Sequence, residues 1–149
     1  MQNLKILNKK QTKEILSIIK KQFGADFKSD YAFLKNEKGK IYLINKDISK
    51  ISLNNLRINS LGLYFAEIRN NEIRLSIEGS QLIGPEANKN IAEINEKQAK
   101  EWMQGNDLEI KGNYEGFLLI KHNNDFLGCG KYREGKVFNF VGKGRRIGL

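Results

Sequence analysis

Residues 128–149 read GCGKYREGKVFNFVGKGRRIGL, a stretch in which glycines and aromatic residues are interspersed with cations. The dipeptide Glu134-Gly135 lies between two segments of strand-like composition and favours a tight two-residue turn. We therefore expect a β-hairpin, in which alternation along each strand places every second side chain on the same side. On one side the expected facing pairs are Arg133 with Lys136, Lys131 with Phe138, and Cys129 with Phe140.

This hairpin would carry a cationic end and an apolar end on one side. Placing Arg133 opposite Lys136 costs electrostatic repulsion, which a bound phosphate would relieve. On the other side, Gly128 and Gly130 leave room for a close neighbour because they carry no side chain. That neighbour is either a packed element of the protein, such as a helix, or a ligand, and the sequence leaves both explanations open.

The positive charge of the chain is concentrated at its two ends. The 149 residues carry a net charge of +9, and residues 1–23 and 130–149 each hold six basic residues against one acid. Residues 24–129 therefore carry a net charge of −1. A positive field localised in this way indicates a polyanionic partner such as a nucleic acid. Lysines that merely keep the ends solvated are the alternative explanation.

The composition restricts the class of protein. With 40% hydrophobic residues the chain can bury a core, and its length allows one domain or two small ones. No apolar run approaches the roughly 18 residues of a membrane span, and the N-terminal MQNLKILNKKQTKEI lacks the apolar core of a signal peptide. We therefore expect an intracellular protein without a membrane partner, located in the cytoplasm, or in the nucleolus if the source is eukaryotic.

Catalytic and metal-binding patterns are weak throughout the sequence. Cys129 and His122 are the only residues of their types, which excludes an internal disulfide and a zinc site of the usual Cys/His type. The run GCGKYREG lacks the serine or threonine that completes a P-loop. His122 ends an expected strand beside a turn, where it would be solvated, and Cys129 is most simply a small core residue. We therefore predict no enzyme activity, no metal and no cofactor.

Hydrophobic spacing predicts the N-terminal elements. Asn8 and Gln11 form a capping-box pattern ahead of apolar residues at helical spacing, and Gly24 follows as a stop signal. Two hairpins and a short helix are expected after this first helix. They are YAFLKN with KIYLIN, the helix DISKISLNNL (47–56), and LGLYFAEIR (61–69) with EIRLSIEG (72–79).

The segment 79–90, GSQLIGPEANKN, contains the only proline and is the expected boundary between domains at 1–86 and 87–149. Beyond it, Asn95 and Gln98 repeat the capping-box pattern at the start of a helix that Gly105 ends. The remaining strand signals are NIAEIN, GFLLIKH (116–122), DFLGCGKYR (125–133) and KVFNFV (136–141).

The order of these C-terminal elements resembles a PUA domain. A strand precedes a short helix with a glycine turn, WMQGNDLEI (102–110), and then come GFLLIKH, DFLGCGK and the basic segment FNFVGKGRRI. The region resembles the PUA domain of the Sun family of RNA cytosine methyltransferases. Nearly the whole chain resembles ribosome-biogenesis factors that pair an N-terminal α/β domain with a PUA domain. The implied fold class is α+β, with an N-terminal α/β domain of antiparallel strands followed by a small mixed-β, PUA-like pseudo-barrel.

The resemblance implies RNA binding through the helix, the glycine turn and the last strands. We expect non-catalytic binding of rRNA or tRNA during its maturation, chiefly in ribosome biogenesis. Two alternatives stay open: an RNA-targeting subunit of a separate RNA methyltransferase, and a protein-interaction adaptor, for instance for a ribosome-assembly factor. With Lys131 added from the hairpin face, the expected RNA-binding residues are Lys97, Lys100, Gly105, Asn106, Lys131, Arg133, Lys136, Lys143, Arg145 and Arg146.

Overall fold

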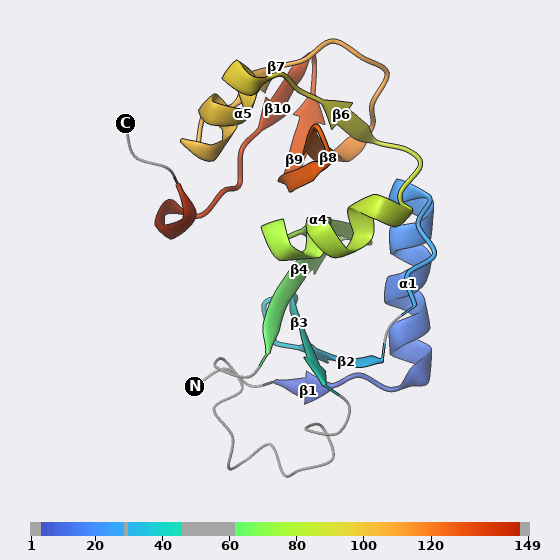
Figure 1. Cartoon of the computed structure of the whole chain (residues 1–149). Helices are drawn as coiled ribbons and strands as arrows, with labels where there is room; N and C mark the ends of the chain where they lie inside the picture. The colour runs from blue at the N-terminus through green and yellow to red at the C-terminus, as the bar shows by residue number, and fades with distance from the viewer. Residues whose placement is uncertain (1–3, 29, 46–61, 147–149) are drawn as a thin grey trace.

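The computed structural model describes residues 4–28, 30–45 and 62–146 and contains two β-sheets with a helix between them (Figure 1). The short helix expected at 47–56 lies outside the described residues. The fold class is α+β, as the sequence predicts: an antiparallel N-terminal sheet is followed by a small mixed sheet of PUA-like type.

The first helix, α1 (Lys9–Phe23), begins and ends where the sequence predicts. The Asn8 side chain accepts a hydrogen bond from the Gln11 backbone N–H at 2.8 Å, and the Gln11 side chain accepts one from the Asn8 N–H at 3.0 Å. Gly24 ends the helix with φ of 70°, a left-handed conformation that glycine adopts without strain. The apolar side of α1 is buried against the N-terminal sheet.

The N-terminal sheet has the strand order β1-β2-β3-β4-β5, with every neighbouring pair antiparallel. Both expected hairpins are present, and Asn70 and Asn71 at the second turn have φ of 52° and 60°. The strands are β1 (Lys5–Ile6), β2 (Tyr31–Lys35), β3 (Lys40–Asn45), β4 (Leu63–Arg69) and β5 (Glu72–Leu75).

The strand expected over 72–79 is wrong beyond Leu75, because residues 77–83 form the helix α4 (Ile77–Ile83). The Ser76 hydroxyl accepts a hydrogen bond from the Gly79 N–H at 2.9 Å and thus caps the helix. A Cβ at Gly79 would collide with the Phe65 carbonyl, so the glycine lets α4 lie directly against β4. A short 3₁₀ turn, η2 (Gly84–Glu86), follows α4 and ends at the expected boundary between residues 86 and 87.

The C-terminal sheet has the order β6-β8-β9-β10-β7, in which β6 and β8 run parallel and the other neighbours are antiparallel. The expected helix is present as α5 (Glu96–Met103), with the capping box of Asn95 and Gln98. The strands are β6 (Ile91–Glu93), β7 (Leu108–Glu109), β8 (Gly116–His122), β9 (Asp125–Arg133) and β10 (Lys136–Phe138).

The register of the last hairpin is confirmed, but its second strand is shorter than predicted. Arg133 pairs with Lys136, and Lys131 pairs with Phe138. The pairing of Cys129 with Phe140 is wrong: β10 ends at Phe138, Cys129 is buried, and Phe140 is 44% exposed. The strand ends there because the Asn139 N–H donates to the Asp107 carboxylate instead of to a neighbouring strand.

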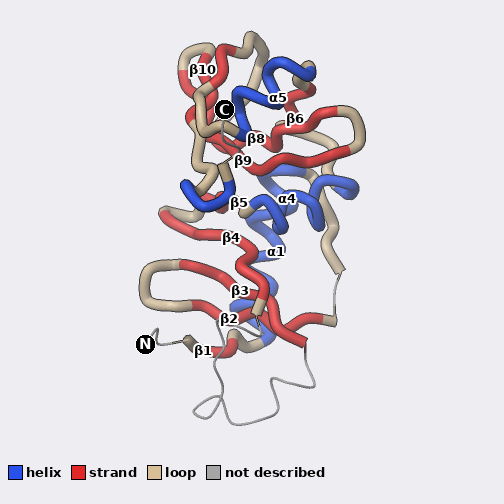
Figure 2. Tube along the Cα trace, turned by 60° about the vertical axis from the view of Figure 1, so that its left-hand side comes forward, coloured by secondary structure: helices blue, strands red, loops and turns tan. Residues whose placement is uncertain are grey.

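The two sheets share part of their hydrophobic core. The larger buried cluster contains the apolar side of α1 and also Leu119, Phe126 and Cys129 from the C-terminal sheet. The smaller cluster surrounds Trp102, which is fully buried. Helix α4 lies between the sheets in both views (Figures 1 and 2), and a Cβ at Gly84, just after it, would collide with the Phe126 ring. The two halves of the chain are thus packed together without a spacer.

Because of this shared core, we expect the chain to unfold in one cooperative transition. Trp102, the only tryptophan, reports on the C-terminal sheet by fluorescence, whereas the far-ultraviolet circular dichroism of α1 reports mainly on the N-terminal half. Urea titrations followed by the two signals should give the same midpoint. Two resolved transitions would contradict the shared core.

Candidate nucleic-acid interface

The turn after α5 is closed by backbone hydrogen bonds. The Gly105 N–H donates to the Trp102 carbonyl, and the Asn106 N–H donates to the Glu101 carbonyl, each at 3.0 Å. Gly105 has φ of 96°, which side-chain-bearing residues rarely adopt. The turn therefore has a defined backbone path and presents Asn106 to solvent.

The side chain of Asn139 attaches the C-terminal segment to this turn. Its amide nitrogen donates to the carbonyls of Trp102 and Asn106, both at 2.8 Å. Its amide oxygen accepts from the Val141 N–H at 2.6 Å. One side chain thus satisfies three backbone groups and determines where residues 139–146 leave the sheet.

Two consecutive arginines then point to different parts of the molecule. The Arg146 guanidinium lies against Gly105, where a Cβ would collide with it, and its Nε donates to the Val141 carbonyl at 3.1 Å. Arg145 pairs with Glu78 of α4. The short turn η3 (Lys143–Arg145) sets the directions of both side chains, and it lies beside α4 in Figure 1. The C-terminal segment therefore contacts both the glycine turn and the helix between the sheets.

The ten sequence-predicted residues do not form one patch. The structure brings Gly105, Asn106 and Arg146 together, and Lys143 lies three residues from Arg146 on the same exposed segment. Lys97 and Lys100 are exposed on α5, which leads into the turn. Arg133 and Lys136 flank the turn that precedes β10, whereas the C-terminal segment follows its other end (Figure 1). Lys131 faces the N-terminal sheet, where it pairs with Glu72.

Three of the expected cations have carboxylate partners inside the molecule. Lys131 pairs with Glu72 at 2.7 Å and Lys136 approaches Asp107 at 3.8 Å, in addition to the Arg145 pair. Exposed pairs of this kind contribute little stability and exchange readily with other anions. Within the described part of the chain, Lys97, Lys100, Arg133, Lys143 and Arg146 have no salt-bridge partner.

The expected repulsion between Arg133 and Lys136 is relieved within the protein. Strand β7 pairs with β10 and places Glu109 opposite Lys136, and the Asp107 carboxylate approaches the same lysine at 3.8 Å. No phosphate is needed to explain why this cationic pair is tolerated. The hairpin turn is thus a mixed-charge region, whereas the C-terminal segment is uniformly basic among its described residues.

The glycines of β9 are explained by packing. A Cβ at Gly130 would collide with Val137 and lie 2.7 Å from the Trp102 ring. Gly128, with φ of 118°, lies against Ile77 of α4. The packing explanation that the sequence left open is therefore confirmed at Gly130, whereas at Gly128 the backbone conformation requires glycine, since a Cβ there would make an ordinary 3.5 Å contact with Ile77.

Cys129 has the environment of a core residue. It is buried, and burial raises the pKa of its thiol to about 12, so the nucleophilic thiolate is not populated at neutral pH. His122 is half-buried at the end of β8. In residues 4–28, 30–45 and 62–146, no group of three His, Cys, Asp or Glu side chains is arranged to hold a metal ion. In the same ranges, no helix is both long and apolar enough to cross a membrane.

Asn139 and Trp102 anchor the C-terminal segment, a role that was not predicted from the sequence. The Trp102 indole N–H donates to the Leu127 carbonyl at 2.9 Å, while its own carbonyl accepts from Asn139. The only available signal was an asparagine in the middle of an otherwise apolar strand pattern, FNFV. Such a residue disfavours a strand and favours local hydrogen bonding to the backbone.

Residues 89–147 match the sequence profile of the family described as the methyltransferase RsmF PUA domain. The matched region begins just before β6 and includes the glycine turn and the C-terminal segment. The C-terminal part of the chain is thus PUA-like.

Two curated relatives support this assignment over a longer range. The chain is 26% identical, over 131 residues, to ribosomal RNA small subunit methyltransferase F from two strains of Vibrio cholerae serotype O1, M66-2 and ATCC 39315. The aligned region is 87% of this chain but only 27% of each relative. The similarity therefore extends beyond the PUA-like region into the N-terminal half of this chain. The chain itself spans about a quarter of the length of these relatives.

We expect Asn139→Ala to destabilise the protein and release the C-terminal segment. Three backbone groups lose a partner, which should lower the free energy of unfolding by about 1–3 kcal/mol. Hydrogen exchange of residues 139–146 should accelerate at the same time. Asn124→Ala, in the exposed β8–β9 turn, is the matched control and should change the free energy of unfolding by about 0.5 kcal/mol or less. Unchanged exchange in Asn139→Ala would show that another contact holds the segment.

Proposed function

We propose that this protein binds RNA during the maturation of ribosomal RNA and has no catalytic activity of its own. The interface consists of the glycine turn, Gly105 and Asn106, together with the exposed basic residues Lys143 and Arg146. The observation that carries the proposal is that the PUA-like match coincides with the segment that Asn139 holds against this turn. RNA binding follows from the PUA resemblance, and ribosomal RNA follows from the activity for which the relatives are named.

The proposed mechanism is electrostatic. Arg146 is fixed beside Gly105 and can clamp a phosphate with two parallel hydrogen bonds, while Lys143 supplies a mobile point charge. Lys97 and Lys100 lie three residues apart on α5 and can each contact a phosphate, although Glu96 and Glu101 leave the helix without net charge. Release of counterions from the RNA drives the association, which therefore depends on salt.

The non-catalytic part of the proposal rests on the chemistry of the reactive residues in the described chain. Cys129 is buried with a raised thiol pKa, and the acids Glu67, Glu72, Glu78 and Asp107 are each paired with a cation. These groups stabilise the fold or its charge balance, and none is poised as a nucleophile or a general base.

The double variant Lys143→Gln/Arg146→Gln tests the interface. With single-stranded fragments of small-subunit rRNA, we expect the affinity to fall by about tenfold for each phosphate that the variant can no longer bind. The slope of log affinity against log salt should become shallower by about 1.4, since each phosphate bound on a single strand contributes about 0.7. Fluorescence anisotropy over a salt series measures both quantities.

The matched control removes two cations from the other basic end. Lys9 and Lys13 are exposed on α1, which lies across the sheets from η3 (Figure 1). Lys9→Gln/Lys13→Gln lowers the net charge equally and should leave most of the salt slope intact. An equal loss of affinity in both double variants would mean that net charge, rather than this interface, governs binding. The hairpin variant Arg133→Gln/Lys136→Gln should have the smaller effect, because Asp107 and Glu109 already surround Lys136.

A second candidate is that the protein targets RNA for a methyltransferase. The specific observation is that the curated relatives are methyltransferases in which the matching region is 27% of the length. Affinity purification of the tagged protein should then recover an RNA methyltransferase. This association should persist after ribonuclease treatment, because it does not depend on bridging RNA. Recovery of ribosomal precursors without such an enzyme would favour independent RNA binding.

A further inference from the structure

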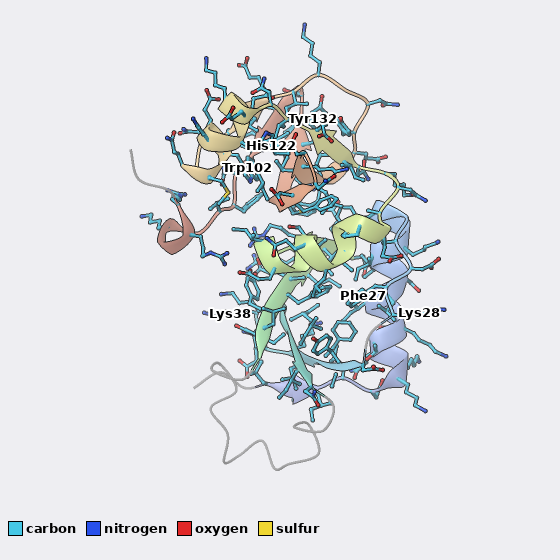
Figure 3. The ribbon with its side chains drawn as sticks, viewed as in Figure 1. Phe27, Lys28, Lys38, Trp102, His122 and Tyr132 are labelled. Atoms are coloured by element: carbon cyan, nitrogen blue, oxygen red, sulfur yellow. The ribbon has the colours of Figure 1, made fainter. Side chains whose placement is uncertain are left out.

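A pocket of about 310 Å³ opens at the seam between the two sheets, next to the C-terminal segment. One wall comes from β3, β4, β5 and the first residues of α4, and the other from β9, residues 140–142 and Arg145. The volume is at the small end of the range for ligand sites in proteins, which suits one planar group rather than a larger molecule. Lys38, labelled in Figure 3, and η3 lie on the same edge of the molecule in that view.

The aromatic ring of Phe140 forms a flat part of this pocket. Phe140 is 44% exposed, although it is a large apolar side chain. The Arg74 guanidinium lies over the ring, 4.2 Å from its centroid. Arg74 is itself held by Glu67 at 2.6 Å, and the side chain of Glu67 is only 10% exposed. Ring and guanidinium are therefore oriented before any ligand arrives, and both are surfaces on which unstacked bases pack.

The charges around the pocket favour an anion. Its charged lining residues are Lys40, Arg74, Arg145 and Glu78, which together carry +2. Lys40 lies over the Tyr64 ring at 5.7 Å from its centroid. Burial raises the pKa of Tyr64, so its hydroxyl stays neutral at physiological pH and adds no negative charge. The lining thus combines a stacking surface with cations suited to a phosphate.

The pocket is continuous with the proposed RNA interface. Arg145 lines the pocket, and the next residue, Arg146, lies against Gly105. The C-terminal segment therefore borders the pocket through Arg145 and the glycine turn through Arg146. A strand of RNA that crosses the C-terminal segment can reach both.

We propose that this pocket accepts one unpaired base of the bound RNA. The base stacks on the face of the Arg74–Phe140 pair that is open to the pocket, while Lys40 contacts one flanking phosphate and Arg145 exchanges Glu78 for the other. This inference rests on the proposed RNA-binding function and adds a preference for RNA with unpaired bases over duplex RNA. It also assigns the N-terminal sheet a direct part in RNA recognition.

The first test compares two RNA probes of equal length, a stem-loop and a fully paired duplex. Phe140→Leu removes the ring but keeps an apolar side chain, and we expect its affinity for the stem-loop to fall about 5- to 150-fold. Its affinity for the duplex and its salt slope should not change, because no charge is removed. Phe140→Tyr should retain the wild-type preference. Urea midpoints of all variants check that the fold is intact.

The second test blocks the pocket without touching the ring. Gly142 lines the pocket with φ of −61°, and a Cβ there would meet no atom within 4 Å, so Gly142→Leu should fold normally and occupy the pocket mouth. Gly144→Leu is the matched control, since its Cβ also meets open space but the residue does not line the pocket. We expect only Gly142→Leu to abolish the preference for the stem-loop.

The outcomes separate this inference from the function on which it rests. If the wild-type protein prefers the stem-loop and both Phe140→Leu and Gly142→Leu lose that preference, the pocket is supported. If the wild-type protein binds RNA but these variants keep the wild-type ratio of affinities, the pocket inference is overturned and the proposed function stands. If the wild-type protein binds neither probe, the proposed function fails.

Discussion

The close approach of α4 to both sheets is the constraint on which the rest of the structure depends. Glycines make it possible: Gly79 lets the helix lie on β4, and Gly84 accommodates the Phe126 ring of the C-terminal sheet. A Cβ at either position would collide with the facing sheet and push the helix away from it. Because the sheets share a core across this helix, residues far apart in the chain form one surface at the seam.

That surface acquires its chemistry from the C-terminal segment. Asn139 ends β10 and ties the segment to the glycine turn, which sends Arg146 toward that turn and Arg145 toward α4. Phe140 is thereby left half exposed over Arg74 of the N-terminal sheet. The function proposed for the PUA-like region and the base pocket inferred at its edge thus depend on the same few hydrogen bonds.

Local sequence patterns predict most of the elements, because caps and turns are decided by neighbouring residues. The capping boxes at Asn8 and Asn95 and the hairpin register at Glu134-Gly135 are confirmed. Helix α4 was missed because its seven residues include a glycine and follow an apparent strand. The distribution of the cations was unpredictable, since it depends on contacts such as Lys136 with Asp107, which only the pairing of β7 with β10 creates.

The central claim is that RNA lies across the glycine turn and the C-terminal segment and reaches the seam between the sheets. Ultraviolet crosslinking of the protein to rRNA in cells, followed by mass spectrometry of the attached peptides, tests it most directly. We expect crosslinked peptides from residues 104–106 and 139–146, with further sites near Arg74. Crosslinks confined to the lysines of α1 or to the β9–β10 turn would contradict it.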